Sequence, residues 1–250
     1  MDCPVVLITG GSRGIGAATA LAAARAGYAV ALSFQTDGQA AQSVVRAIEV
    51  LGGRAMALQA DVAQEDGVLA MFAAVDAAWG RLDALVNNAG VVDVASRVDA
   101  MSVARLRRMF DTNVLGSFLC AREAVLRMST RHGGAGGSIV NLSSAAALLG
   151  SPNQYVDYAA SKAAIDTFTM GLSKEVATEG IRVNGVRPGL ILTDIHASGG
   201  QPDRAHQLAN QVPMQRPGTA EEVAQGIVWL LGDAASYVTG TTLNVAGGRV

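Results

Sequence analysis

The sequence predicts an α/β fold in which a doubly wound parallel sheet of about seven strands carries helices on both faces. Short apolar runs alternate with longer segments of helical periodicity along most of the chain. Strands that are apolar almost throughout are typical of a parallel sheet that is buried on both sides. The predicted strands are residues 5–9, 29–34, 55–59, 84–87, 138–142, 182–186 and 242–245. Helical periodicity is clear in residues 17–26, 63–79 and 161–179.

The chain is predicted to form a single domain over residues 1–250. This length suits one compact domain, no Pro-rich or Ser-rich linker divides it, and we find no internal repeat. Residues 190–218 interrupt the alternation with several glycines and prolines. A long irregular segment within a compact domain is commonly functional, so we expect a mobile flap there.

The composition excludes several classes of protein. Hydrophobic residues make up 50% and charged residues 16% of the chain, which is incompatible with disorder. The net charge of −2 argues against a nucleic-acid binder, and the densest basic cluster, Arg105, Arg107 and Arg108, is interpreted as a solvated helix face. The longest uncharged stretch, 133–156, is too polar to span a bilayer, and no targeting segment is found. With only two cysteines at uninformative spacing, a cytoplasmic protein is expected.

The first predicted strand leads into a glycine-rich turn at residues 9–16, which reads Thr-Gly-Gly-Ser-Arg-Gly-Ile-Gly. Because a helix follows, free N–H groups and the positive end of the helix dipole face the turn and favour a pyrophosphate. Glycine allows the tight turn and the close approach of the main chain to the phosphates. Methyltransferases also contain such a turn, but its place here in a βαβ unit is the one that dinucleotide binding requires.

Tyr158 and Lys162 lie four residues apart in a helical stretch, so their side chains lie on one face. An ammonium group close to the phenol would lower the pKa of Tyr158 by as much as ~3, toward neutral pH, where proton transfer is efficient. Ser143 and Ser144 follow the fifth predicted strand at the edge of the sheet where α/β proteins bind ligands. A hydroxyl there would stabilise charge on a substrate oxygen, which predicts an acid–base site.

Further motifs occur in the order found in short-chain dehydrogenases/reductases, and the chain resembles that family from residue 4 to its C-terminus. They are Thr-Gly-x-x-x-Gly-x-Gly at 9–16, Asp61-Val62, Asn-Asn-Ala-Gly at 87–90, Asn113 within Asp-Thr-Asn-Val-Leu-Gly, Tyr-x-x-x-Lys at 158–162 and Pro-Gly-x-x-x-Thr at 188–193. The resemblance implies a single-domain Rossmann fold similar to that of 3-oxoacyl-ACP reductase-like and glucose 1-dehydrogenase-like members.

The resemblance also implies roles for the matching residues. The expected catalytic residues are Asn113, Ser144, Tyr158 and Lys162. The expected cofactor-binding residues are Gly10, Ser12, Arg13, Gly14, Ile15, Gly16, Phe34, Gln35, Asp61, Val62, Asn88, Ala89, Gly90, Tyr158, Lys162, Pro188, Gly189, Ile191 and Thr193. The expected substrate contacts are Ser144, Tyr155 and Tyr158, with Ser143 as the alternative serine because Ser144 stands one residue further from Tyr158 than in the commonest pattern. His196 and His206 lack a partner at metal-ligand spacing, so no metal is predicted.

NADP is predicted in preference to NAD. An acidic residue ending the second strand would bond the ribose 2′-hydroxyl and repel a 2′-phosphate, but Phe34 stands there. Arg13 can reach a phosphate, and a charge-assisted hydrogen bond contributes ~1.5–3 kcal/mol. NAD remains possible because no second basic residue accompanies Arg13.

The sequence therefore predicts an NADPH-dependent reductase of ketones or 3-oxoacyl compounds, which transfers a hydride between nicotinamide and a carbonyl carbon. An NAD-linked sugar or polyol dehydrogenase is the alternative, followed by a dinucleotide-sensing protein without catalysis. Residues 1–135 are expected to bind the cofactor, and residues 136–250 to carry the catalytic residues, with a substrate flap at 190–218. The expected partners are a small-molecule substrate and further copies of the chain in a homotetramer, with neither nucleic acid nor membrane.

Overall fold

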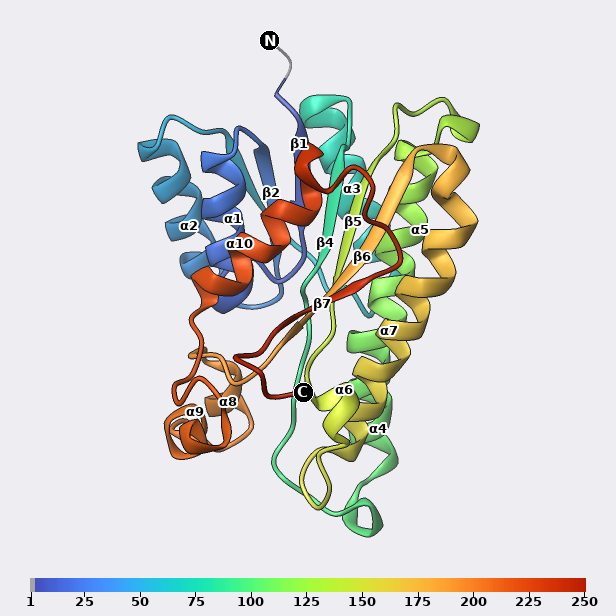
Figure 1. The fold of residues 1–250 in the computed structure, drawn as a ribbon. Coiled ribbons are helices and arrows are strands. Elements are labelled where there is room, and N and C mark those ends of the chain that lie inside the picture. Colours follow the sequence, from blue (N-terminus) through green and yellow to red (C-terminus); the bar gives the residue numbers. More distant parts are fainter. Residues whose placement is uncertain (1–2) are drawn as a thin grey trace.

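Seven parallel strands form one sheet in the order β3-β2-β1-β4-β5-β6-β7 (Figure 1). The computed structural model describes residues 3–250 apart from the side chains of residues 196 and 197, so the prediction made for His196 lies outside the described residues. The strands are β1 (Val5–Ile8), β2 (Ala29–Phe34), β3 (Ala55–Gln59), β4 (Ala84–Asn87), β5 (Gly137–Leu142), β6 (Ile181–Pro188) and β7 (Thr242–Val245). The order reverses between β1 and β4, as expected of a doubly wound sheet.

Helices connect the strands and cover the sheet. They are α1 (Gly14–Arg25), α2 (Gly38–Val50), α3 (Glu65–Trp79), α4 (Val103–Phe110), α5 (Gly116–Met128), α6 (Ala146–Leu149), α7 (Val156–Val176), α8 (Ile195–Ser198), α9 (Arg204–Gln207) and α10 (Ala220–Leu231). Across the described part of the chain, none of these helices is both long and apolar enough to cross a membrane.

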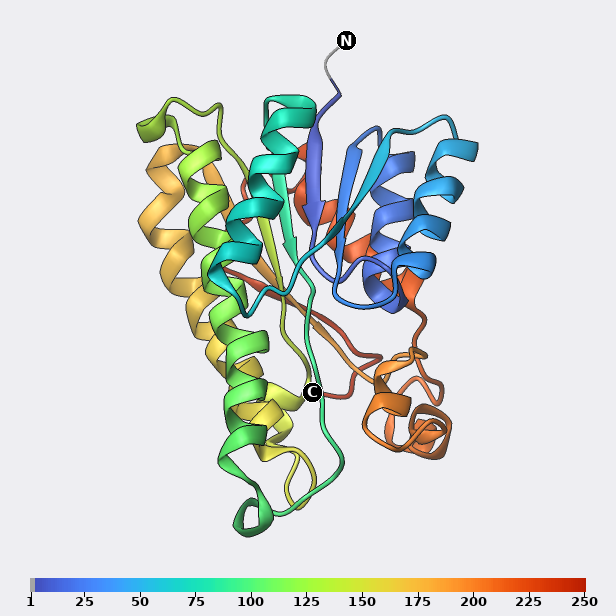
Figure 2. The same cartoon turned by 180° about the vertical axis from the view of Figure 1, so that it is seen from behind.

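The sheet separates two apolar cores because each strand sends alternate side chains to opposite faces. Val6 and Ile8 of β1 pack in a core with α1, α2 and α10, whereas Val5 and Leu7 pack in a core with α3, α5 and the end of α7. Figures 1 and 2 show the resulting layer of helices on each side of the sheet. Helices on both faces confirm the predicted architecture.

Two elements extend beyond their predicted limits. β6 continues past residue 186 to Pro188 because β7 pairs with Gly185–Pro188. α7 begins at Val156 rather than at residue 161. The acidic side chain of Asp157 in its first turn interacts favourably with the positive end of the helix dipole and stabilises this start. The longer helix places Tyr158 and Lys162 on regular helical backbone, one turn apart.

Residues 190–218 are less irregular than the sequence predicts. They contain α8, α9 and a 3₁₀ turn at Ala209–Gln211. A parallel bridge between Ile191 and Gly218 brings the two ends of the segment together. The segment therefore forms a small lobe beside the carboxyl ends of the strands, at the lower left of Figure 1.

Candidate active site

The glycine-rich turn between β1 and α1 keeps its main chain open to a ligand. Gly10 has a φ of +64°, a conformation that favours glycine. A Cβ atom at residue 16 would lie 2.3 Å from the main-chain oxygen of Gly10, so glycine is needed for α1 to pack this closely against the turn. The side chain of Arg13, at the N-cap, makes no capping hydrogen bond within the described structure. The N–H groups of the first turn of α1 are thus available to an anion such as a pyrophosphate.

Asn88 joins the glycine-rich turn to the end of β4. Its side-chain nitrogen donates hydrogen bonds to the main-chain oxygens of Thr9 and Gly10, at 2.8 and 2.9 Å. Thr9 Oγ1 in turn accepts hydrogen bonds from the main-chain N–H groups of Asn88 and Ala89, each at 3.0 Å. These bonds fix two loops at the carboxyl edge of the sheet, on either side of the point where the strand order reverses.

A cavity of about 240 Å³, which we name the glycine-loop cavity, lies along this edge. The predicted cofactor-binding residues that line it are Gly10, Ser12, Arg13, Gly14, Ile15, Phe34, Gln35, Asp61, Val62, Asn88, Ala89, Gly90 and Thr193. Gly16 is not among the lining residues and acts through the packing of α1. Sequence reasoning missed Ser33, whose hydroxyl accepts a hydrogen bond from the N–H group of Gly10 at 3.2 Å. The alternation of side chains along β2 is the signal that could have found it.

The charged side chains that line the glycine-loop cavity are Arg13, Asp37, Asp61 and Asp194. The carboxylate of Asp37 caps α2 by accepting a hydrogen bond from the N–H group of Ala40 at 2.9 Å. That of Asp61 accepts one from the N–H group of Ala63 at 3.0 Å. Arg13 is exposed and is the one cationic side chain among the described residues of this lining. It is therefore the lining side chain best suited to a phosphate.

Tyr158, Lys162 and Ser144 meet beside a second cavity. Lys162 Nζ lies 5.8 Å from the centre of the Tyr158 ring, and the Ser144 hydroxyl lies close enough to the Tyr158 phenol to lower its pKa. Lys162 Nζ also donates a hydrogen bond to the main-chain oxygen of Leu142 at 2.6 Å, which ties α7 to the end of β5. The structure thus brings together three of the four side chains that the sequence predicts to be catalytic.

The two serines that follow β5 have different surroundings. Ser143 is 3% exposed, and its hydroxyl donates a hydrogen bond to the main-chain oxygen of Lys162 at 3.0 Å. The Ser144 hydroxyl instead contacts Tyr158 and accepts a hydrogen bond from the N–H group of Ala146 at 3.1 Å. Because the Ser143 hydroxyl is turned toward the main chain of α7, the geometry favours Ser144 as the serine that meets a substrate.

Burial dominates the electrostatics of the pair on α7. It raises the pKa of the Tyr158 phenol, while the hydrogen bond with Ser144 lowers that pKa in part. Burial also lowers the pKa of Lys162 from 10.5 to about 8, against the opposing charge of Asp166. The expectation that Lys162 brings the pKa of Tyr158 down toward neutral is therefore wrong for this structure. The cost of burying a phenolate exceeds the stabilisation that its neighbours supply.

Asn113 lies in a π-helical segment, Asp111–Leu115, between α4 and α5. Its Oδ1 accepts a hydrogen bond from the N–H group of Val91 at 2.8 Å, and its Nδ2 donates one to the oxygen of Val91 at 3.0 Å. A Cβ atom at residue 90 would lie 3.3 Å from Asn113 Oδ1 and 3.5 Å from Lys162 Nζ, so both groups reach the space beside Gly90. A π-helical turn bends the helix, and here it directs Asn113 toward the loop after β4. Asn113 Nδ2 also donates a hydrogen bond to Ser161 Oγ at 3.1 Å, so Asn113 contacts the helix that carries Lys162.

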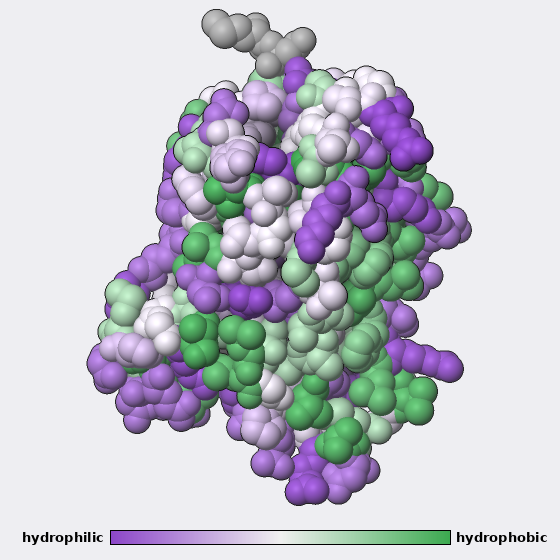
Figure 3. Space-filling view, turned by 45° about the vertical axis from the view of Figure 1, so that its right-hand side comes forward, coloured by the Kyte–Doolittle hydropathy of each residue, from purple (hydrophilic) through white to green (hydrophobic). Residues whose placement is uncertain are grey.

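The second cavity, which we name the Tyr158 cavity, has a volume of about 480 Å³. It contains Tyr155 and the remaining predicted cofactor-binding residues Tyr158, Lys162, Pro188, Gly189 and Ile191. It shares the lining residues Ile15, Asn88, Gly90, Thr193 and Ile195 with the glycine-loop cavity. In Figure 3 hydrophobic residues gather on the lower half of the visible face, toward the carboxyl ends of the strands. The shared boundary lets ligands of the two cavities meet beside Tyr158.

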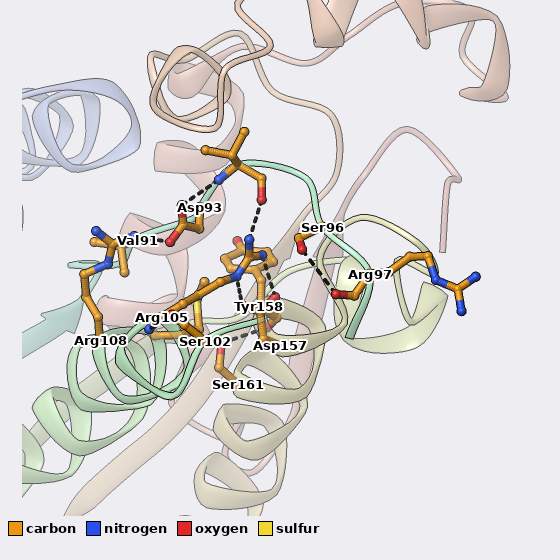
Figure 4. Close-up of polar contacts among 12 residues, drawn as sticks. Val91, Asp93, Ser96, Arg97, Ser102, Arg105, Arg108, Asp157, Tyr158 and Ser161 are labelled. Atoms are coloured by element: carbon orange, nitrogen blue, oxygen red, sulfur yellow. Dashed lines mark hydrogen bonds and ion pairs between the residues drawn. The ribbon is translucent and has the colours of Figure 1, made fainter. Parts of the chain in front are cut away.

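Arg105 does not belong to a solvated helix face, so that prediction is wrong for this residue (Figure 4). Its Nε and Nη2 donate hydrogen bonds to the two carboxylate oxygens of Asp157, at 2.7 and 3.2 Å, and its Nη1 donates one to the oxygen of Val94 at 2.5 Å. The side chains of Arg105 and Asp157 are 10% and 0% exposed. Since Asp157 directly precedes Tyr158, this buried ion pair holds the start of α7 against α4. Sequence reasoning missed it because nothing local marks partners so far apart in the chain.

Comparison with known proteins agrees with this geometry. A family model described as enoyl-(acyl carrier protein) reductase matches residues 10–249. The chain is 57% identical over 245 residues to the uncharacterized oxidoreductase YgfF of Escherichia coli (strain K12), covering 98% of this chain and 99% of that one. It is 39% identical over 251 residues to the 3-oxoacyl-[acyl-carrier-protein] reductase of Synechocystis sp., covering 100% and 98%. The solved structure of a short chain dehydrogenase from Burkholderia cenocepacia J2315 in complex with NADP is similar, with a TM-score of 0.89, 36% identity and coverage of 98% and 97%.

The protein combines a Rossmann-like sheet, a glycine-rich turn suited to a pyrophosphate and a cluster of Ser144, Tyr158 and Lys162. This combination defines an oxidoreductase that uses a nicotinamide dinucleotide. The chain belongs to the short-chain dehydrogenase/reductase family, which confirms the resemblance found in the sequence. It is an enzyme that acts on CH–OH or C=O groups with this cofactor.

Proposed function

We propose that this enzyme is an NADPH-dependent reductase of carbonyl compounds, of the ketone or 3-oxoacyl type. The observation that carries the proposal is that Ser144 and Tyr158 line the same cavity where it adjoins the glycine-loop cavity, with the Ser144 hydroxyl acting on the Tyr158 phenol. A carbonyl oxygen placed beside these two hydroxyls would accept a hydrogen bond from each. The similarity to the 3-oxoacyl-[acyl-carrier-protein] reductase of Synechocystis sp. supports this type of substrate.

In this proposal the side chains act on the carbonyl oxygen. Ser144 polarises the carbonyl, and Tyr158 donates the proton to its oxygen. The Tyr158 phenol keeps its proton at neutral pH and can donate it, but burial raises its pKa, so the phenolate that forms needs stabilising neighbours. Lys162 stabilises the phenolate that remains. Asn113 relays protons from solvent to replace the one that Tyr158 donates. When bound, the cofactor supplies the hydride that adds to the carbonyl carbon.

The preference for NADPH rests on the glycine-loop cavity. Arg13 lies in its lining with an exposed guanidinium, while Phe34 occupies the end of β2, where an acidic residue would repel a 2′-phosphate. The neighbouring Asp37 is engaged in capping α2. The similar structure from Burkholderia cenocepacia, which is in complex with NADP, supports the same choice.

The test follows the absorbance of NADPH and NADH with purified enzyme and a panel of β-ketoesters, diketones, aromatic ketones and aldehydes. We expect oxidation of NADPH, and a loss of about 100- to 10,000-fold in kcat for Tyr158→Phe, which removes the general acid. Tyr237→Phe is the matched control, because Tyr237 is fully exposed and does not line the Tyr158 cavity. Arg13→Gln should raise the KM for NADPH and leave that for NADH nearly unchanged.

Other outcomes would favour the alternatives. Turnover of sugars or polyols with NAD would identify an NAD-linked dehydrogenase. Tight binding of either cofactor without turnover of any carbonyl compound or alcohol would identify a dinucleotide-sensing protein.

We also propose that the enzyme is a homotetramer, packed partly through α5 and α7. Phe118 and Phe168 stack with their ring centres 3.8 Å apart on this flank, and Phe118, Leu126 and Met170 are 45%, 47% and 47% exposed. A subunit contact would remove this apolar surface from water. Light scattering should give four times the chain mass, and Phe118→Glu should reduce it. A monomeric wild-type enzyme would contradict the proposal.

A further inference from the structure

Two arginines reach the Tyr158 cavity without an acidic partner. Arg204 comes from α9 and Arg249 from the C-terminal segment, and both line the cavity. Arg204 Nη1 donates a hydrogen bond to Gln201 Oε1 at 2.7 Å, and Arg249 Nη2 donates one to Gln211 Oε1 at 3.2 Å. These acceptors are neutral amides, and within the described residues neither arginine forms an ion pair with Asp or Glu. No carboxylate among the described residues therefore neutralises either guanidinium.

The described lining of the Tyr158 cavity as a whole carries an excess of positive charge. The charged side chains among its described lining residues are Lys162, Arg204 and Arg249, and that lining contains no Asp or Glu. The charge of Arg204 acts on Arg249, since burial lowers the pKa of Arg249 and the charge of Arg204 lowers it further. Partly buried like charges repel, so an anion that binds between them would relieve an unfavourable arrangement.

The structure holds Arg204 against the wall of the Tyr158 cavity. Its guanidinium carbon lies 5.2 Å from the centre of the Tyr155 ring, at the distance of a cation–π contact. Tyr155 is only 6% exposed and directly precedes α7, the helix that carries Tyr158. A guanidinium stacked on an aromatic ring keeps its N–H groups available at the edge, in the geometry that suits carboxylate and phosphate. The site is thus prepared before a ligand arrives.

We propose that the preferred substrates of this enzyme are carbonyl compounds or secondary alcohols that carry an anionic group, a carboxylate or a phosphate, which Arg204 and Arg249 bind while the carbonyl meets Ser144 and Tyr158. This inference rests on the proposed function and specifies its substrate class. A cavity of about 480 Å³ has room for a small organic acid or phosphate ester.

The first test compares matched substrates that differ only in charge. One pair is a short aliphatic oxo acid and its primary amide, and the other is dihydroxyacetone phosphate and dihydroxyacetone. With NADPH and the wild-type enzyme, we expect kcat/KM to be at least about tenfold higher for the charged member of one pair, as for a single charge-assisted contact. The pair that shows the preference identifies the anion. Equal values within both pairs would overturn the inference.

The second test uses Arg204→Gln, Arg249→Gln and their combination. Each change should raise the KM of the preferred anionic substrate at least about tenfold more than that of its neutral partner. Arg54→Gln is the control for charge, because Arg54 is exposed and directly precedes β3, at the end of the sheet opposite the cavity. Equal effects of Arg204→Gln on both members of a pair would overturn the inference, since that result indicates a structural role.

A binding measurement separates failure of this inference from failure of the proposed function. Calorimetric titration of the NADP-loaded enzyme with benzoate, phenyl phosphate and neutral benzamide needs no turnover. We expect one of the anions to bind at least about tenfold more tightly than benzamide, and this preference to disappear in the double variant. If no carbonyl compound is reduced but this preference is found, the proposed function fails and the anion site stands. If neither anion is preferred, the anion site fails whatever the enzyme reduces.

Discussion

The glycine-loop cavity and the Tyr158 cavity share a boundary, but different parts of the chain form them. The loops that follow β1, β2, β3 and β4 at the carboxyl edge of the sheet supply most of the lining of the first, joined by bonds such as that from Asn88 to Gly10. Side chains from α6, α7, residues 190–218 and the C-terminal segment border the second. Long-range contacts, such as the ion pair of Arg105 with Asp157, hold its walls. The shape of the glycine-loop cavity is therefore set mainly by the sheet and the loops at its edge. The shape of the Tyr158 cavity depends on a few separate side-chain contacts.

The largest expected effect is loss of the ion pair that holds the start of α7. Asp157→Asn leaves the nearly buried guanidinium of Arg105 without its carboxylate. Removing one partner of a buried ion pair costs about 3–5 kcal/mol, so the free energy of unfolding in urea should fall by that amount. If the enzyme still folds, KM for the carbonyl substrate should rise more than KM for NADPH, because Asp157 adjoins Tyr158.

The neighbouring Arg107 provides the control for this ion pair. It lies on the same helix, α4, but is exposed, so Arg107→Gln should change the free energy of unfolding by less than about 0.5 kcal/mol. Equal losses in the free energy of unfolding for Asp157→Asn and Arg107→Gln would show that the ion pair does not stabilise the start of α7.

The next prediction concerns the glycine-rich turn, whose main chain lines the glycine-loop cavity. A Cβ atom in Gly16→Ala would lie 2.3 Å from the oxygen of Gly10 and 2.5 Å from Asn88 Nδ2, so the turn must move. We expect calorimetry to show about 100-fold weaker binding of NADPH, which corresponds to ~3 kcal/mol. Gly232→Ala adds the same methyl group 3.6 Å from its nearest neighbour and should leave binding unchanged. Normal binding by Gly16→Ala would mean that the turn adapts and that the two cavities do not differ as described.

A smaller effect concerns Lys162, which stands where the two cavities adjoin. Burial lowers the pKa of Lys162 from 10.5 to about 8, so between these pH values the folded enzyme binds fewer protons than the unfolded chain. Its stability relative to Lys162→Met should therefore rise with pH, by about 2 kcal/mol between pH 8 and pH 10. Urea unfolding of both proteins at a series of pH values measures this difference. A constant difference would show that the Lys162 ammonium is not desolvated.

The sequence was sufficient for the parts of the site that one short segment determines. The strand ends, the glycine-rich turn and the spacing of Tyr158 and Lys162 depend on neighbouring residues, and the structure places them as predicted. The pairing of Arg105 with Asp157 and the position of Arg249 in the Tyr158 cavity could not be read from local pattern, because they depend on how distant segments pack. The direction of the pKa shift at Tyr158 was missed for the same reason, since burial is known only after folding.

The smallest effect that we predict refines the prediction for Lys162. Asp166 lies one helical turn after Lys162, and its charge raises the pKa of Lys162 against the effect of burial. Arg187 Nε donates a hydrogen bond to Asp166 Oδ2 at 2.9 Å, which reduces the influence of that charge without cancelling it. Asp166→Asn should therefore lower the pKa of Lys162 further, and the rise in stability relative to the Lys162→Met, Asp166→Asn double variant should begin at lower pH.

Asp66→Asn, at an exposed position on α3, makes the same change in net charge and should not move the transition. Because Arg187 also loses its partner in Asp166→Asn, a transition that moves to higher pH would show that Asp166 acts on Lys162 through packing rather than through its charge.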